Sequence, residues 1–487
     1  MVLIVCMVLF LSFAEAEVFM NCKRCYCVDH FMNCRNVNMH EVDIQNISHI
    51  TSIDLSNNNL HDLNFDDLSN LVNLSSVNLS YNKLRRISDK IFHSLPELNE
   101  VFISHNFLVD IPLTAFEKNS NLRNLFLNNN NVSTIAFISK ILHCNVRKLD
   151  LSHNNVKQIQ DEAFSNCNFI IELDVSNNKI GTLYSNAFRG LTRLQVLKLH
   201  NNAISVISTT LFSSNYNLTL LDLSNNIIDS INHCTFYNQI KMSSLNLSNN
   251  VLEYIPSKLF MMCANLQELV LSHNNIGAIA SGVFRVNGTD LTKEKCGLIV
   301  KDNYFHHTKR SLSRLDLSHN SLHHIDVSLL HIFRENASLD VTYNKIRTLN
   351  SDLIHAINEI GVHVSFEKNL FKCDCDALYD AYVTHVELNM QLNVTCDNTQ
   401  SWTLFHDLIC DDPERQATLP AAVADYDEDI RVDDVIKDEQ VIQNIFVIIV
   451  CVALVCVTIL GSSFMAKYYK LRIENVLYSY VADTSVL

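Results

Sequence analysis

The sequence predicts an α/β solenoid, in which short parallel strands stack into a curved horseshoe with the sheet on its concave face, closed at both ends by disulfide caps and followed by one transmembrane helix. Three observations favour this architecture. An apolar pattern recurs every 24 residues, cysteines cluster on both sides of the repeats, and a run of 22 residues near the C-terminus carries no charge.

The first 16 residues have the composition of a secretory signal peptide. An apolar run from Val2 to Ala14 precedes the small-x-small triplet that ends at Ala16, which predicts cleavage before Glu17. No Lys or Arg precedes this run, so an uncleaved N-terminal anchor is the alternative, although the run is too short to span about 30 Å of hydrocarbon. We expect residues 17–49 to form an N-terminal cysteine cap.

The repeats occupy residues 50–368, as about 12 to 14 units of the form LxxLxLxxN. Ten units keep a step of 24 residues, and their first apolar positions are Ile50, Leu74, Leu98, Leu122, Val146, Ile170, Leu194, Leu218, Met242 and Leu266. The ninth positions are Asn58, Asn82, Asn106, Asn130, Asn154, Asn178, Asn202, Asn226, Asn250 and Asn274. A phenylalanine column follows the same step, with Lys140 as its one interruption, at Phe92, Phe116, Phe164, Phe188, Phe212, Phe236, Phe260 and Phe284.

This spacing dictates a physical arrangement. In LxxLxL the apolar residues alternate on a short strand and point inward, while the residues between them point outward. One unit cannot bury its apolar side alone, so the units stack. An asparagine amide carries both a donor and an acceptor for the backbone groups of the bend after the strand. The phenylalanines widen the opposite side relative to a strand spacing of about 4.8 Å, so the stack is expected to curve.

With these residues the chain resembles extracellular leucine-rich repeat proteins of the 24-residue type, such as Toll-like receptor ectodomains and insect surface proteins. The regular step breaks after Leu266, because the next clear unit starts 46 residues later at Leu312, and two more units open at Asn336 and about Ile360. The irregular interval 285–311 contains Leu298, which fits a degenerate unit, but an insertion loop is equally compatible with its sequence.

Cysteine clusters at both ends of the repeats resemble the flanking caps of the same family. The resemblance implies an N-terminal cap with the pairs Cys22–Cys27 and Cys25–Cys34, and a C-terminal cap over residues 369–410 with the pairs Cys373–Cys396 and Cys375–Cys410. Zinc binding is the competing interpretation of such spacings, but a secreted chain favours disulfides.

The remaining ectodomain cysteines are not assigned to pairs by the sequence. Without Cys6, Cys451 and Cys456, 13 of the 16 cysteines are left before the membrane segment, so at least one is unpaired or bonded to another chain. Cys167 and Cys263 occupy positions that hold leucine in other units, so a buried free thiol is the default for both, yet Cys144 and Cys167 lie close enough to bridge. The partners of Cys234 and Cys296 stay open, with Cys296 as a loop tether or an intermolecular bond.

The C-terminal part of the sequence predicts a single-pass type I membrane protein. Residues 411–440 form an acidic stem, with 11 acidic and 3 basic residues between Asp411 and Glu439. Residues 441–466 form the transmembrane helix, and the basic residues after it place the tail 467–487 in the cytosol, at the plasma membrane. The final residues Ser485, Val486 and Leu487 fit the C-terminus that PDZ domains capture, and tyrosine-based sorting signals are a weaker match for an adaptor.

Composition excludes several classes of function. Asp plus Glu number 52 against 37 for Lys plus Arg, a net charge of −15, which argues against nucleic-acid binding. The chain has 8 glycines and neither a GxxxxGK[ST] nor a GxGxxG string, so a nucleotide site is not expected. No nucleophile, base and orienting residue stand outside the repeat pattern, and we expect neither an enzyme nor a cofactor or metal.

Two aromatic residues stand out on the predicted concave face. Phe102 and Phe126 occupy the outward position between the second and third apolar residues of neighbouring strands, where most units carry a polar residue. Two adjacent exposed aromatics form an apolar patch typical of a contact site. Charged residues on its two sides are expected to orient a partner: Arg123, Arg147 and Lys148 on one, Glu100 and Glu172 on the other. Mutual packing of the two rings alone is the alternative.

Sequons agree with a lumenal path for everything before the membrane segment. They lie at Asn46, Asn73, Asn78, Asn131, Asn217, Asn246, Asn287, Asn336 and Asn393. Asn78 and Asn246 occupy the same outward strand position as the two phenylalanines, so glycans there would cover part of the concave face.

Two functions are compatible with these features. The first is a cell-surface receptor or co-receptor that binds an extracellular protein ligand on the concave face and signals through a partner or adaptor. The second is a homophilic or heterophilic adhesion molecule, for which the partner is an identical chain or another surface protein. The sequence fixes neither the ligand nor the oligomeric state.

Overall fold

The computed structural model describes residues 24–42, 49–141, 143–284 and 311–372, together with residues 388 and 394. All of them belong to the first of two compact units, which extends from Met1 to Ala417. The predicted signal peptide, most of the predicted C-terminal cap, and the predicted acidic stem, transmembrane segment and tail lie outside the described residues. Within the described ranges no helix has the length and apolar character needed to cross a membrane.

One large, almost entirely parallel sheet runs through the described repeats. Its strands, in the order in which they pair, are β1 (Tyr26–Val28), β2 (Phe31–Asn33), β3 (Ser52–Asp54), β5 (Ser76–Asn78), β7 (Glu100–Phe102), β8 (Asn124–Phe126), β9 (Lys148–Asp150), β11 (Glu172–Asp174), β13 (Val196–Lys198), β14 (Leu220–Asp222), β15 (Ser244–Asn246), β17 (Glu268–Val270), β19 (Leu312–Asp316), β20 (Phe333–Asp340) and β21 (His363–Ser365). Only β1 and β2 pair antiparallel; from β2 onward each strand lies parallel to the next.

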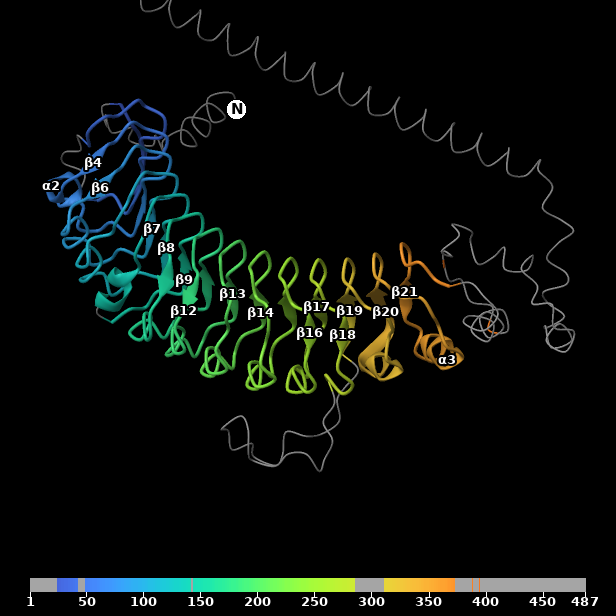
Figure 1. Ribbon diagram of the computed structural model, residues 1–487. Helices are drawn as coiled ribbons and strands as arrows, with labels where there is room; N and C mark the ends of the chain where they lie inside the picture. The colour runs from blue at the N-terminus through green and yellow to red at the C-terminus, as the bar shows by residue number, and fades with distance from the viewer. Residues whose placement is uncertain are drawn as a thin grey trace, which may run out of the picture. The chain divides into compact units, whose positions relative to one another are not determined.

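Shorter elements occupy the opposite side of the units. Three two-stranded parallel sheets form from β4 (Asp62–Leu63) with β6 (Arg86–Ile87), β10 (Gln158–Ile159) with β12 (Thr182–Leu183), and β16 (Tyr254–Ile255) with β18 (Ala278–Ile279). Among the described residues the helical elements are α2 (Phe65–Leu68), α3 (Ser351–Ile360) and two 3₁₀ turns, η1 (Ala136–Lys140) and η2 (Val327–Ile332). The repeats follow one another along a curve, with β7, β8 and β9 on its inner side (Figure 1).

The core consists of the repeated apolar positions. Leu74, Val77 and Leu79 of one unit are fully buried, and the corresponding residues of the other nine units with the 24-residue step are buried as well. The phenylalanine column is confirmed: the ring centres of Phe188 and Phe212 lie 6.1 Å apart, wider than a strand spacing of about 4.8 Å. At the Lys140 interruption Phe137 fills the column, 6.2 Å from Phe116.

The asparagine ladder also forms as predicted. Asn130 Nδ2 donates to the carbonyls of Ile103 in the preceding unit (2.9 Å) and Leu127 in its own (3.0 Å). Its Oδ1 accepts from the Leu108 backbone N–H at 3.1 Å. Each buried amide therefore satisfies backbone groups of two neighbouring units and locks them in register.

A second set of buried amides was not predicted. Asn119, Asn215 and Gln239 replace the leucine that other units carry at this position, and all three are buried. Asn119 Nδ2 donates to the carbonyls of Phe92 (2.9 Å) and Leu95 (2.8 Å) in the preceding unit. The signal was present in the sequence as polar residues in an otherwise apolar column.

The irregular interval is an insertion with respect to the sheet. β17 pairs directly with β19, with Leu269 opposite Leu315, so no strand from residues 285–310 comes between them. Residues 285–310 themselves lie outside the described residues, and so does Cys296.

The described cysteines correct one expectation. Cys25 and Cys34 are disulfide-bonded, as the resemblance to the N-terminal cap implies. Cys144 and Cys167 also form a disulfide, with their Cα atoms 4.8 Å apart, so the default of a free thiol at Cys167 was wrong. Cys263 is a buried free thiol, as expected. Cys27 and Cys234 are each disulfide-bonded, whereas Cys22, Cys373, Cys375, Cys396 and Cys410 lie outside the described residues.

Candidate functional site

The exposed face of the large sheet brings Phe102 and Phe126 together. Parallel pairing of β7 with β8 places the two residues opposite each other, and both side chains point away from the core. Their rings are stacked, with centres 4.8 Å apart and planes inclined by 4°. Each ring stays half-buried, so the pair presents an apolar surface that its own packing does not cover.

The charges around the aromatic pair are arranged differently from the prediction. Glu100, Lys148 and Glu172 do not face one another across the pair, because strand pairing puts them in a single row that also contains Asn124. Within that row Asn124 Nδ2 donates to Glu100 Oε1 at 2.7 Å. Lys148 Nζ lies 2.8 Å from Glu172 Oε2. Lys148 and Glu172 therefore neutralise each other, while the Glu100 carboxylate keeps its charge and accepts a hydrogen bond from Asn124.

Lys148 also connects the row to the aromatic pair, since its Nζ lies 5.8 Å from the centre of the Phe126 ring. Arg123 and Arg147, the other predicted cations, are exposed on the edge of β8 and β9 and form no ion pair among the described residues. These two guanidinium groups are the cations beside the aromatic pair that are available to a partner.

Next to the phenylalanines the same outward column becomes charged. Asp150 on β9 has two neighbours in this column: Phe126 on β8 and Asp174 on β11. Burial raises the pKa of the Asp150 carboxyl, and the charge of Asp174 adds to this, although hydrogen bonds from Ser152 oppose it. Lys198 Nζ lies 3.1 Å from Asp174 Oδ2 and 3.9 Å from Glu172 Oε1. Burial lowers the pKa of Lys198, but the contacts with Asp174 and Glu172 outweigh it and the pKa is raised.

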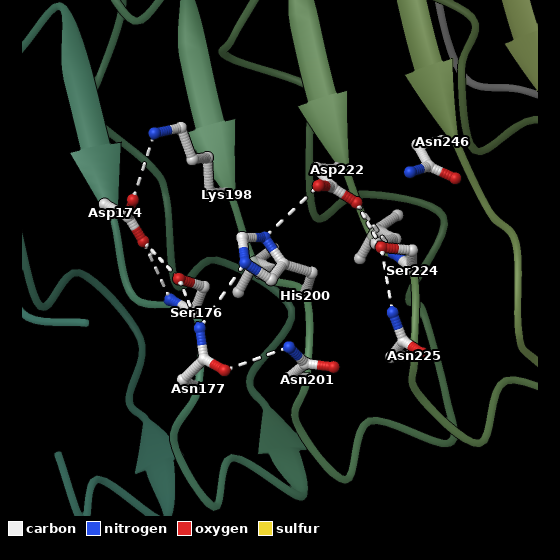
Figure 2. Close-up of polar contacts among 12 residues, drawn as sticks. Asp174, Ser176, Asn177, Lys198, His200, Asn201, Asp222, Ser224, Asn225 and Asn246 are labelled. Atoms are coloured by element: carbon white, nitrogen blue, oxygen red, sulfur yellow. Dashed lines mark hydrogen bonds and ion pairs between the residues drawn. The ribbon is translucent and has the colours of Figure 1, made fainter. Parts of the chain in front are cut away.

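A polar network extends from this column to the edge of the sheet (Figure 2). His200 stands where the neighbouring units carry Ser176 and Ser224, and its Nδ1 lies 3.2 Å from Asp222 Oδ2 without hydrogen-bond geometry. Its Nε2 lies 3.4 Å from Asn177 Nδ2. Sequence reasoning missed His200, and the one signal for it was a histidine in a column of serines.

The asparagines of the network fix the orientation of His200. Asn201 Nδ2 donates to Asn177 Oδ1 at 2.9 Å, so the Nδ2 of Asn177 is the group that faces the imidazole. An amide N–H can only donate, so Nε2 of His200 accepts and Nδ1 carries the proton in the neutral ring. The protonated Nδ1 then lies 3.2 Å from Asp222 Oδ2 but does not form a hydrogen bond with it.

Two sequons lie on the exposed face of the sheet. Asn78 on β5 lies opposite Phe102, and Asn246 lies on β15 opposite Asp222. The side-chain oxygens of both accept from the backbone N–H of the serine two residues later. Asn217 is held more firmly, because its Nδ2 donates to the Thr192 carbonyl and its Oδ1 accepts from Lys241 Nζ at 2.7 Å. Among the other sequons, Asn73, Asn131 and Asn336 are exposed, while Asn46, Asn287 and Asn393 lie outside the described residues.

The described sheet face presents one aromatic pair among charged and amide side chains. Lys148, Glu172, Asp174 and Lys198 are paired with one another on this face, whereas Arg123 and Arg147 form no ion pair among the described residues. In the part of the chain that the structure describes, no group of three or more His, Cys, Asp or Glu side chains is placed to hold a metal ion. The PDZ-type residues Ser485, Val486 and Leu487 lie outside the described residues.

Comparisons with known families agree with this geometry. A model of the leucine rich repeat matches residues 144–204, 192–252 and 216–276. A model of the BspA type leucine rich repeat region matches residues 41–171. None of the curated protein sequences matches the chain.

Several solved structures share the fold. TLR13, solved in a complex with ssRNA13, is 21% identical with a TM-score of 0.56, and the match covers 77% of this chain and 56% of TLR13. Toll of Drosophila, solved with Spatzle, is 20% identical with a TM-score of 0.57, over 74% of this chain and 51% of Toll. A leucine-rich repeat protein of Leptospira interrogans is 20% identical with a TM-score of 0.54, over 70% and 84% of the two chains. This chain thus spans about half the length of the two Toll-type proteins.

Proposed function

The chain is a leucine-rich repeat protein, and we propose that it is a cell-surface receptor or co-receptor that binds a protein ligand on the exposed face of its parallel sheet. The observation that carries this proposal is the stacked pair Phe102–Phe126. Most other units place Asp, Asn or Lys in the same column, so two adjacent aromatic side chains there are not needed for the repeat itself.

The physical basis is the surface that the pair leaves uncovered. Aromatic rings bring large contact area with little loss of side-chain entropy, and an apolar patch within polar surroundings is the usual centre of a protein interface. Both rings sit on strands of a rigid stack, so a ligand finds the patch already formed. Arg123 and Arg147 beside it form no ion pair among the described residues and supply polar contacts at its rim.

The proposal includes the membrane anchor that the sequence predicts. A signal peptide over 1–16 and a transmembrane helix over 441–466 would place the repeats outside the cell and the tail 467–487 inside it. We infer that the signal passes through a partner chain or through an adaptor that reads the tail.

Cell display of the full-length protein tests the proposal. Display cells are challenged with a panel of labelled extracellular proteins, and the double variant Phe102→Asp with Phe126→Asp is compared with the wild type. The matched control is Val270→Asp, because Val270 occupies the same outward column on β17. We expect a ligand whose binding the double variant abolishes and the control retains. A ligand that binds the double variant as well as the wild type would place the site elsewhere.

Cell aggregation separates the receptor from the adhesion molecule. Dye-labelled display cells are mixed with unlabelled display cells or with naive cells. No clumping, with surface expression verified by antibody, is the expected result for a receptor. Clumping confined to display cells and lost in the double variant would replace the receptor proposal with homophilic adhesion through the same surface.

A further inference from the structure

A second apolar surface lies on the edge of the repeats, away from the face of the sheet. Just after β5 the side chains of Tyr81, Lys83 and Arg85 point outward, and the residues between them, Asn82 and Leu84, are buried. In the next unit His105, Phe107 and Val109 repeat this alternation around two buried residues. Each of the two segments thus presents a row of three outward side chains.

The two rows lie side by side. The rings of Tyr81 and His105 are stacked, with centres 4.1 Å apart and planes inclined by 9°. The Phe107 backbone N–H donates to the Leu84 carbonyl at 2.8 Å, which places Phe107 beside Lys83. Val109 occupies the position of Arg85 one repeat later. Together these six residues form the edge patch.

The apolar members of the edge patch are strongly exposed. Tyr81 is 53%, Phe107 51% and Val109 57% exposed, and they belong to adjacent units. Single exposed apolar residues are ordinary, but a contiguous group of them usually marks a surface that another molecule covers. Nothing within the described part of the chain covers this one.

The cations of the edge patch indicate the charge of a molecule that would cover it. Lys83 and Arg85 are exposed and form no ion pair among the described residues. Asp110, the carboxylate that follows Val109, accepts from the Ile111 backbone N–H at 2.9 Å. By contrast, Lys148, Lys198 and Arg314 on the sheet face all have carboxylate partners. Lys83 and Arg85 thus bring two unneutralised positive charges beside the apolar side chains of the edge patch.

We propose that the edge patch binds an acidic protein segment that also carries aromatic or aliphatic side chains. The segment lies along the two rows, with its carboxylates against Lys83 and Arg85 and its apolar side chains on Phe107 and Val109. This surface is separate from the Phe102–Phe126 pair and does not depend on the function proposed for that pair.

Defined polymers test the chemistry without a known partner. Purified full-length protein in phosphatidylcholine nanodiscs is titrated with fluorescein-labelled random copolymers and followed by anisotropy. The probes are poly(Glu,Tyr), poly(Glu) of equal length, poly(Lys,Tyr) and heparin. We expect poly(Glu,Tyr) to bind about tenfold more tightly than each of the others, a difference of about 1.4 kcal/mol. Equal binding of poly(Glu) or heparin would overturn the proposal, because the apolar row would then contribute nothing.

Matched variants locate the site. Lys83→Glu with Arg85→Glu, and separately Phe107→Ser with Val109→Ser, are each expected to weaken poly(Glu,Tyr) binding about tenfold. The control is Lys157→Glu with Lys179→Glu, because these exposed lysines occupy the same two repeat positions on other units. The control keeps its affinity within about twofold. An equal loss in the control would mean that general charge and not the edge patch binds the probe, and the proposal would fail.

The sheet face serves as a second control. Phe102→Asp with Phe126→Asp leaves the edge patch unchanged, so poly(Glu,Tyr) binding should persist in that variant. Loss of the probe in this variant, with Lys83→Glu and Arg85→Glu having no effect, would assign the probe to the sheet face and refute the edge patch. Circular dichroism of every variant verifies that the fold is retained.

Discussion

Lys148 and Glu172 form an ion pair of 2.8 Å between adjacent strands, and the same ammonium group lies 5.8 Å from the centre of the Phe126 ring. One cation therefore joins the aromatic pair to the charged part of the sheet face. The ammonium group contacts both the Glu172 carboxylate and the Phe126 ring, and both of these side chains belong to strands of the stack. The polar surroundings of the aromatic pair are thus largely set before a ligand arrives.

This ion pair is expected to add little to stability. The side chains of Lys148 and Glu172 are 41% and 28% exposed, so water screens their attraction. A double-mutant cycle with Lys148→Ala and Glu172→Ala should give a coupling free energy of unfolding below about 1 kcal/mol. The coupling, measured by urea denaturation, should fall further in 1 M NaCl. A coupling that is larger and independent of salt would contradict this view of the row.

Asn226 and Asn225 provide a sharp test of the asparagine ladder. Asn226 is buried, donates to the carbonyls of Leu199, Leu223 and Ser224, and accepts from the Ile204 N–H. Asn226→Ala leaves these groups without partners and should lower the free energy of unfolding by about 2–4 kcal/mol. The adjacent Asn225 is exposed and has a φ of 53°, a conformation that glycine adopts readily. Asn225→Gly should therefore change the free energy of unfolding by less than about 1 kcal/mol. If urea denaturation gave the same change for Asn226→Ala and Asn225→Gly, the asparagine ladder would not be a main source of stability between the units.

The disulfide Cys144–Cys167 joins two successive units and closes a loop of 23 residues. Replacing both cysteines by alanine should lower the free energy of unfolding by about 3 kcal/mol, since the unfolded chain gains freedom. Thermal unfolding of the double variant measures this. The control is Cys263→Ala, which removes a sulfur that closes no loop. The loss of unfolding free energy in this control should come only from the small cavity that the sulfur leaves. If both variants lose the same amount, the bond contributes nothing through the unfolded state.

The sequence predicts the fold well because the repeat determines it. A step of 24 residues sets which side chains point inward, and the structure places Leu74, Val77 and Leu79 in the core accordingly. The same step also places Phe102 opposite Phe126 without any further information. Register in a stack of identical units follows from counting residues, so these contacts are visible in the sequence.

Interactions between columns are less predictable. The pairing of Lys148 with Glu172 depends on side-chain conformations, and the sequence suggested only that charges lie near the aromatic pair. His200 meets Asn177 and Asp222 because it replaces a serine, and nothing in the step of the repeat indicates that. Cys144 and Cys167 lie one repeat apart, but proximity alone allowed either a bond or two thiols.

Cys263 is expected to be chemically inert in the folded protein. Burial raises the pKa of its thiol to about 12, so at pH 8 almost none of it is thiolate, the form that reacts. N-ethylmaleimide should leave Cys263 unmodified without denaturant and label it fully in 6 M guanidinium. Peptide mapping by mass spectrometry reads this position separately from the other cysteines. Rapid labelling of the native protein would show that this unit opens locally.

Asp150 provides a test through pH. Burial raises the pKa of its carboxyl, so the folded state binds the proton more tightly than the unfolded chain does. The stabilising effect of that proton is present below the unfolded pKa and is lost as pH rises through the folded pKa, so the charged form opposes folding at neutral pH. Asp150→Asn keeps an oxygen for the Ser152 N–H, which donates to Asp150 Oδ1 at 2.9 Å. The variant should therefore have the higher free energy of unfolding at pH 7, and this advantage should vanish below the pKa of the unfolded aspartate. Urea denaturation at both pH values measures the difference, and a variant less stable than the wild type at pH 7 would show that the carboxylate is favoured in this position.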